Sequence, residues 1–290
     1  MIKTNYHTHS TFCDGKESAE AMARAAYEKG FEILGFSSHA MFPFSDSWHI
    51  HITPGGYEAY VGEIKRLKEE YRGRLTILTG FEADYIPGLT KPDSDDGECY
   101  ARFTPDFLIG SVHFVLGDGG YYEADGPAKE TRERIQKYFG GDVRKAVASY
   151  FEAERQMLRT SHFTILGHPD VIRKQNRSSG GTGPLFNEEE GWYMEELEKT
   201  AEAIAASGVI VEINTGGMAR GYMDSPFPSP AFLRLLHDRK VPVTINSDAH
   251  RSEHLDFAFD QAVQLAVEAG YTELAYLDGD GVKFQEISRS

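Results

Sequence analysis

The feature of this sequence that most constrains its fold is a regular alternation of short apolar segments with longer amphipathic ones. Six segments are almost continuously apolar, as is typical of parallel strands buried on both faces; they span residues 31–38, 75–82, 105–112, 163–167, 208–214 and 241–247. We count residues 1–7 as a seventh strand. Helical patterns occupy residues 17–30, 55–71, 142–160, 189–208, 229–240 and 253–270, and several of them end in glycine.

This alternation over the whole chain predicts an α/β fold with a parallel sheet and helices outside it. Seven strand–helix units in 290 residues favour a distorted seven-stranded (β/α)7 TIM-like barrel over an open sheet. No linker divides the sequence, so we expect residues 1–290 to form a single domain. Two loop insertions stand out, an acidic one at residues 87–105 and a polar, glycine-rich one at residues 173–187.

Composition argues against several classes of protein. A formal net charge of −15 without a basic stripe disfavours nucleic acid and anionic membrane surfaces as partners. A small anionic substrate is still compatible with this charge, because bound metal ions can reverse the local field. No apolar run reaches the roughly 18 residues of a membrane span, and no signal peptide is evident. Two cysteines far apart, Cys13 and Cys99, predict a cytoplasmic protein without disulfides. No motif specifies an oligomeric state.

Side chains that bind metal ions stand at or just after nearly every predicted strand. They are His7, His9, Asp14, His39, Glu82, His113, His168, Asp248 and His250. The carboxyl ends of parallel strands meet at one rim of a barrel, so these nine side chains are expected to converge there. Imidazole and carboxylate ligands without thiolate suit Zn²⁺, Mn²⁺ or Fe²⁺. Nine ligands are too many for one ion and indicate two or three, with Glu82 able to bridge a pair.

The remaining histidines have simpler interpretations. Residues 48–51 contain a second His-x-His pattern, but it lies in a loop, so we interpret His49 and His51 as loop residues that could face a substrate. His162, His237 and His254 lie in or beside predicted helices and are interpreted as structural or solvated. Cys13 borders Asp14 and is interpreted as a small buried thiol.

The motifs HTHSTFCDG, SSHA, GFEADY, GSVHF, GHPD and NSDAH occur in this order along almost the whole chain. In order and spacing they resemble the polymerase-and-histidinol-phosphatase (PHP) superfamily, and most of all its monofunctional histidinol-phosphate phosphatases. The resemblance implies a distorted seven-stranded barrel with a trinuclear metal centre. It assigns His7, His9, Glu82 and Asp248 to a first ion, Glu82, His113 and His168 to a second, and Asp14, His39 and His250 to a third. One departure is Ser38, where many relatives carry aspartate, and it could loosen the orientation of His39.

Two arginines are the candidates for substrate binding. Arg173 follows the GHPD motif and Arg220 follows the strand at residues 208–214. A position on the rim suits bidentate binding of phosphate oxygens, and the resemblance also implies substrate-contacting arginines in these two loops. The alternative at each position is an exposed surface arginine.

The predicted activity is metal-dependent hydrolysis of L-histidinol phosphate to L-histidinol and phosphate, a step of histidine biosynthesis. A hydroxide held between two ions that share Glu82 would attack phosphorus, and Asp248 or a metal-bound water would protonate the leaving alkoxide. Glu82, Asp248 and His250 are therefore the candidate catalytic residues. One alternative is a PHP phosphoesterase for a nucleotide, an oligonucleotide end or a phosphotyrosyl protein. The other is a metal-binding module without catalytic activity.

Overall fold

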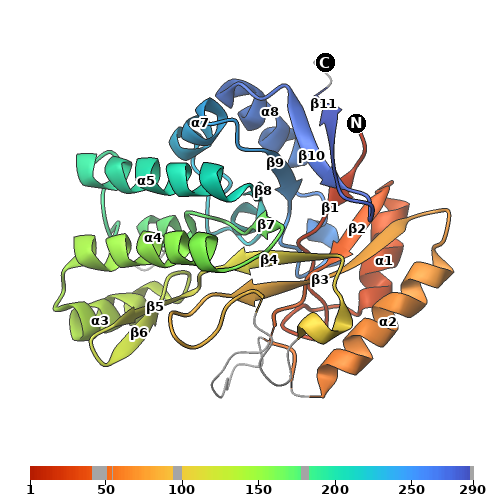
Figure 1. Cartoon of the computed structure of the whole chain (residues 1–290), viewed down its shortest axis with the longest axis horizontal. Helices are drawn as coiled ribbons and strands as arrows, with labels where there is room; N and C mark the ends of the chain where they lie inside the picture. Colours follow the sequence, from red (N-terminus) through yellow and green to blue (C-terminus); the bar gives the residue numbers. More distant parts are fainter. Residues whose placement is uncertain (41–50, 54, 94–99, 178–182, 288–290) are drawn as a thin grey trace.

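The computed structural model describes residues 1–40, 51–53, 55–93, 100–177 and 183–287. Within them, seven parallel strands form one sheet in the order β1-β2-β3-β4-β7-β8-β9 (Figure 1). The strands are β1 (Thr4–Asn5), β2 (Ile33–Phe36), β3 (Thr76–Asp84), β4 (Phe107–Ser111), β7 (Ile165–Leu166), β8 (Ile210–Asn214) and β9 (Val243–Asn246). Each of the seven predicted strand segments overlaps one of these strands, and β3 extends two residues beyond its predicted segment.

The sheet closes almost completely on itself. Just beyond β1 and β9, Thr8 and Ala249 form a parallel bridge. The backbone nitrogen of His9 donates to the carbonyl of Ala249 at 2.9 Å, and the nitrogen of Ala249 donates to the carbonyl of His7 at 3.0 Å. This closure confirms the predicted seven-stranded barrel and brings the exits of the first and last strands together.

Helices surround the sheet (Figure 1). They are α1 (Ala19–Glu28), α2 (Gly56–Glu70), α3 (Ala128–Phe139), α4 (Val143–Thr160), α5 (Gly191–Ser207), α6 (Gly216–Ala219), α7 (Pro230–Asp238) and α8 (Phe259–Ala269). Side chains of Ser18, Asp142 and Ser229 accept hydrogen bonds from the first turns of α1, α4 and α7, which fixes where these helices begin. All six predicted helical segments contain a helix. Helix α3 was not predicted, because only three of its side chains, spaced four residues apart, are buried.

A hairpin at the end of the chain covers one end of the barrel. It consists of β10 (Glu273–Leu277) and β11 (Val282–Glu286), which pair antiparallel. Ala275 and Leu277 pack with Tyr6, Phe107 and other residues that lie mostly at the beginnings of the parallel strands. The Tyr6 hydroxyl accepts from the nitrogen of Leu277 at 2.8 Å and donates to its carbonyl at 3.0 Å. With this end closed by apolar packing, the opposite rim is where polar side chains gather.

A second hairpin, also not predicted, lies next to that rim. Strands β5 (Phe114–Gly117) and β6 (Gly120–Glu123) pair antiparallel directly after His113. Three short 3₁₀ helices of the described chain are η1 (Tyr100–Phe103) before β4, η2 (Val171–Asn176) after β7 and η3 (Ser252–His254) after β9. Of the two predicted insertions, residues 94–99 and 178–182 lie outside the described part of the chain. Among the described residues, none of the helices has the length and apolar character needed to span a membrane.

Candidate metal centre

All nine side chains predicted at the strand ends converge on one rim of the barrel. Most are buried: the exposed fraction is 0% for His7 and His9, 1% for Glu82, and at most 9% for His39, His113, His168 and Asp248. They come from six separate stretches of the chain, so only the closed barrel brings them together. The geometry therefore agrees with the convergence expected from the sequence.

Glu82 lies at the centre of this cluster. Its Oε2 is 3.1 Å from His7 Nε2 and 3.1 Å from His39 Nδ1. Its Oε1 is 3.0 Å from His168 Nε2 and 3.5 Å from His113 Nε2. The two carboxylate oxygens thus face two different sets of imidazoles, which is the arrangement a carboxylate needs to bridge two cations. Glu82 lies inside β3 rather than after it, and the strand extends to Asp84.

Asp248 approaches the same cluster from the exit of β9. Its Oδ1 is 3.2 Å from His9 Nε2 and 3.7 Å from His7 Nε2. The backbone of Asp248 is left-handed, with φ of 48°, which a non-glycine residue adopts only when its surroundings impose it. Gly216 makes this approach possible, because a Cβ at that position would stand 2.8 Å from the Cβ of Asp248.

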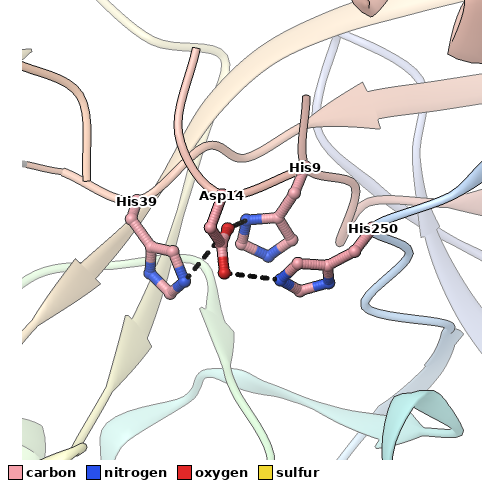
Figure 2. A group of neighbouring side chains, drawn as sticks. All are labelled: His9, Asp14, His39 and His250. Atoms are coloured by element: carbon pink, nitrogen blue, oxygen red, sulfur yellow. Dashed lines mark hydrogen bonds and ion pairs between the residues drawn. The ribbon is translucent and has the colours of Figure 1, made fainter. Parts of the chain in front are cut away.

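A third group forms around Asp14, in the loop that follows β1 (Figure 2). Its carboxylate oxygens lie 3.0 Å from His250 Nε2, 3.6 Å from His9 Nδ1 and 3.9 Å from His39 Nε2. The His9 and His250 rings are stacked with centroids 4.2 Å apart. This group is the more open side of the cluster, since the Asp14 side chain keeps 23% of its surface exposed.

The donor atoms fit divalent metal ions. Four groups have one ligand atom per residue, all within 4.8 Å of one another: His9–Asp14–His39–His250, His7–His168–Asp248, His7–His9–Glu82 and Glu82–His113–His168. Within the described chain, the buried His7 Nε2, His9 Nε2 and Asp14 Oδ1 lack a hydrogen-bond partner. Such atoms are costly to bury unless a cation binds them. The group Glu82–His113–His168 equals the second predicted set, and His9 joins the third; which residues share an ion stays a prediction.

Charge in the metal-free cluster is balanced between imidazoles and carboxylates. Burial by itself would lower the pKa of His7, but Glu212, Glu82 and Asp248 raise it well above its usual value. Burial would raise the pKa of Glu82, yet the facing histidines hold it well below the usual range. Burial would also raise the pKa of Asp248, but Arg220, its strongest cationic neighbour, and the facing histidines hold it well below its usual value. Cations are therefore already favoured between these carboxylates.

The sequence analysis missed Glu212, a buried carboxylate in the middle of β8. Its oxygens lie 2.9 and 3.1 Å from His7 Nδ1, and they accept from Asn214 Nδ2 at 2.7 Å and Asn246 Nδ2 at 2.8 Å. The backbone nitrogen of His168 donates to it at 2.9 Å. Glu212 thereby directs Nε2 of His7 into the cluster. The available signal was a single charged residue inside the apolar segment GVIVEIN.

Asp84 was missed as well. Its Oδ1 lies 2.8 Å from His113 Nδ1 and accepts from the His113 backbone nitrogen at 3.2 Å. The hydrogen bond to Nδ1 leaves His113 Nε2 facing Glu82. Asp84 therefore orients His113 in the same way as Glu212 orients His7. The signal was its spacing, because residues two apart in a strand share a face, and Asp84 follows Glu82 by two.

The two predicted substrate arginines have different surroundings. Arg220 reaches the cluster, with Nη2 2.7 Å from Asp248 Oδ2 and Nη1 3.0 Å from His250 Nδ1, and 29% of its side chain is exposed. Arg173 is 3% exposed, and its Nε donates to Glu188 at 2.7 Å while Nη1 lies 3.6 Å from Asp170. The alternative considered for it, an exposed surface arginine, is therefore not what the structure shows. A role in phosphate binding stays a prediction, and buried ion pairs also give Arg173 a structural role.

Other residues of the sequence analysis have simpler outcomes. His49 and Cys99 lie outside the described residues. Cys13 is a half-buried free thiol, with Sγ 3.4 Å from His9 Nδ1. His162 is exposed and faces Asp93 at 3.0 Å, in agreement with a solvated surface residue. Ser38 is fully buried, and its effect on the orientation of His39 stays a prediction.

This fold and this cluster define the class of protein. Residues 5–216, most of the chain, match the PHP domain, so the chain belongs to the PHP domain family. It is 26% identical over 272 residues to the histidinol-phosphatase of Bacillus subtilis (strain 168), covering 90% of this chain and 98% of that protein.

Two solved structures share the fold over nearly their whole length. One is a candidate histidinol phosphatase, HisK, from Listeria monocytogenes, with a TM-score of 0.74, 22% identity, and coverage of 89% of this chain and 99% of that one. The other is the histidinol phosphate phosphatase of Lactococcus lactis, in complex with zinc, L-histidinol and phosphate, with a TM-score of 0.69, 21% identity and coverage of 97% and 99%.

Proposed function

We propose that this protein is a metal-dependent phosphomonoester hydrolase that converts L-histidinol phosphate and water to L-histidinol and phosphate. The observation that carries the proposal is the cluster of nine histidines and acids centred on Glu82, in a chain that aligns over 90% of its length with a histidinol-phosphatase. The zinc, histidinol and phosphate bound by the Lactococcus lactis protein of the same fold support both the metal and the substrate class.

The metal ligands we propose are the nine residues predicted from the sequence. Their orphaned buried nitrogen and oxygen atoms fit two or three divalent ions, of which zinc, manganese and iron suit this donor set. Such ions, when bound, supply an activated water and neutralise charge on the phosphoryl oxygens. Glu82 would bridge two of them, because its two oxygens face different sets of histidines.

The protein's own side chains have three further tasks in this proposal. Arg220 holds a guanidinium beside Asp248 and His250, where it can donate to phosphoryl oxygens and stabilise the charge that grows on them. Glu212 and Asp84 fix the rings of His7 and His113. Against the effect of burial, Arg220 and the facing histidines lower the pKa of Asp248 and favour its ionised form, and its role as proton donor to the leaving alkoxide stays a prediction. A catalytic role for His250 stays a prediction.

The test is phosphate release by metal-loaded protein from L-histidinol phosphate, nucleotides, sugar phosphates, an oligonucleotide 3′-phosphate and a phosphotyrosyl peptide. We expect kcat/KM to be largest for L-histidinol phosphate. A clear preference for another ester would replace this substrate while keeping the metal-dependent phosphatase. No turnover of any ester, including a generic aryl phosphate, would indicate a binding module instead.

We also propose a cytoplasmic location and a single domain. Two cysteines in 290 residues, of which Cys13 is a free thiol, support a reducing compartment. One sheet collects strands from residues 4–246, and the hairpin β10–β11 packs against it, which supports one cooperative unit.

A further inference from the structure

Asp125 stands beside the metal centre on a segment that is held firmly in place. The nitrogen of Ala124 donates to the carbonyl of His113 at 2.8 Å, at the base of the β5–β6 hairpin. Gln175 Nε2 donates to both carbonyls that flank Asp125, at 2.9 and 3.0 Å. Lys174 Nζ donates to the carbonyl of Asp125 itself. The backbone around Asp125 is thus fixed by a candidate metal ligand on one side and by η2 on the other.

The carboxylate of Asp125 faces positive groups without forming a close pair. Lys174 Nζ lies 4.0 Å from its Oδ2, beyond hydrogen-bond distance, and sits 4.4 Å from the centre of the Tyr222 ring. Burial would raise the pKa of Asp125, but Lys174, His113, His168 and Arg220, in this order, lower it. The Asp125 side chain is 39% exposed, and no donor of the described residues hydrogen-bonds to its oxygens.

A fixed, ionised carboxylate at this place needs an explanation. The neighbouring cluster and Arg220 are suited to a phosphate dianion, and a second anion next to that dianion disfavours its binding. The carboxylate would assist binding only if the same substrate carried a positive charge a few ångströms from its phosphate. L-Histidinol phosphate does so, because an ammonium group is attached to the carbon next to the phosphoester carbon.

We propose that the Asp125 carboxylate binds the ammonium group of the substrate and thereby selects 2-aminoalkyl phosphates over phosphates that lack an amine. This inference deepens the proposed function and rests on it for the site, but it concerns the amine alone and not the imidazole. Asp125 is a specificity residue in this proposal. Its charge-assisted hydrogen bond to the ammonium group orients the leaving group while the phosphate is held by the cluster.

The test uses a matched pair of substrates, 2-aminopropyl phosphate and propyl phosphate, which differ only in the amine. For the wild-type protein we expect a higher kcat/KM with the amine present. In Asp125→Asn that value falls about 10–100-fold, the range of one charge-assisted hydrogen bond, whereas kcat/KM for propyl phosphate rises because a repelling charge is removed. Asp118→Asn is the control, since it removes the same charge at the tip of the same hairpin, about 16 Å away along the strand, and should leave the ratio unchanged.

Two results would overturn the inference: a wild-type protein that does not prefer the amine, or a fall in Asp125→Asn that is equal for both substrates. Metal content, measured on the same samples, would then show whether Asp125 acts through the metal centre. The proposed function is tested separately with L-histidinol phosphate. If that ester is not preferred while Asp125→Asn still abolishes the preference for the amine, the ammonium site stands and the histidinol assignment fails.

Discussion

Replacing Glu212 by glutamine tests whether the carboxylate in β8 organises the metal centre. The substitution keeps the size of the side chain but exchanges one acceptor oxygen for a donor NH₂. If that NH₂ takes the place of Oε2, it faces the donor Asn246 Nδ2, which lies 2.8 Å from Oε2 in the wild type. One hydrogen bond to a charged acceptor is lost and buried donors are left facing each other.

The expected loss of stability is about 3 kcal/mol, the sum of these two effects at their usual size. For 290 residues the entropy of unfolding is about 0.6 kcal/mol/K, so Tm of the metal-free protein should fall by about 5 °C. The larger consequence is for metal binding. His7 Nδ1 loses a bidentate anionic partner at 2.9 and 3.1 Å, and the loss of such a partner weakens metal affinity about 10–100-fold.

The assay combines thermal unfolding of the metal-free protein with competitive zinc titration against a chromophoric chelator. Glu154→Gln is the matched control: Glu154 is equally buried, on α4, where it accepts from the Tyr150 hydroxyl at 2.9 Å, outside the nine-residue cluster. This control should bind zinc like the wild type. The reasoning is refuted if Glu212→Gln binds zinc within threefold of the wild-type affinity.

Three further predictions concern metal, substrate and pH. Removing metal with a chelator should lower Tm by about 7 °C, which corresponds to about 4 kcal/mol at a thousandfold excess over Kd; an unchanged melting curve would argue against a structural contribution of the ions. Arg220→Lys replaces a planar guanidinium, which can donate two hydrogen bonds, by an ammonium point charge beside Asp248, and it should lower kcat/KM about 100-fold. Unchanged steady-state kinetics at equal metal content would reject a role of Arg220 in phosphate binding. Burial, partly offset by the Tyr150 hydroxyl, raises the pKa of Glu154 well above 4.5, so this carboxyl is neutral when folded and ionises on unfolding. The wild type should therefore lose stability relative to Glu154→Gln as pH rises above about 4.5, by up to about 1.4 kcal/mol per pH unit, and parallel Tm curves from pH 4.5 to 8 would contradict the shift.

The sequence by itself determined the barrel and the nine side chains of the metal cluster. Both follow from local patterns. A buried parallel strand is a short run of apolar residues, and the polar residue at its carboxyl end is the first one that follows this run in the sequence. His7 and His9 could be assigned to one face of a strand without knowing the neighbours of that strand. The rule that parallel strands present their carboxyl ends at one rim then brought the candidates together.

Only the tertiary structure decided which groups surround them. Glu212 and His7 form a hydrogen bond although they are 205 residues apart in the sequence. No short sequence pattern encodes which strand supplies the carboxylate that contacts a given imidazole. Arg173 follows a site motif yet its buried side chain pairs with the buried Asp170 and the half-buried Glu188, because the course of η2 places it there. Asp125 reaches the rim through a hairpin whose position depends on Gln175 from another segment. Contacts between distant segments are fixed by packing of the whole chain, and for that reason they were beyond the sequence patterns.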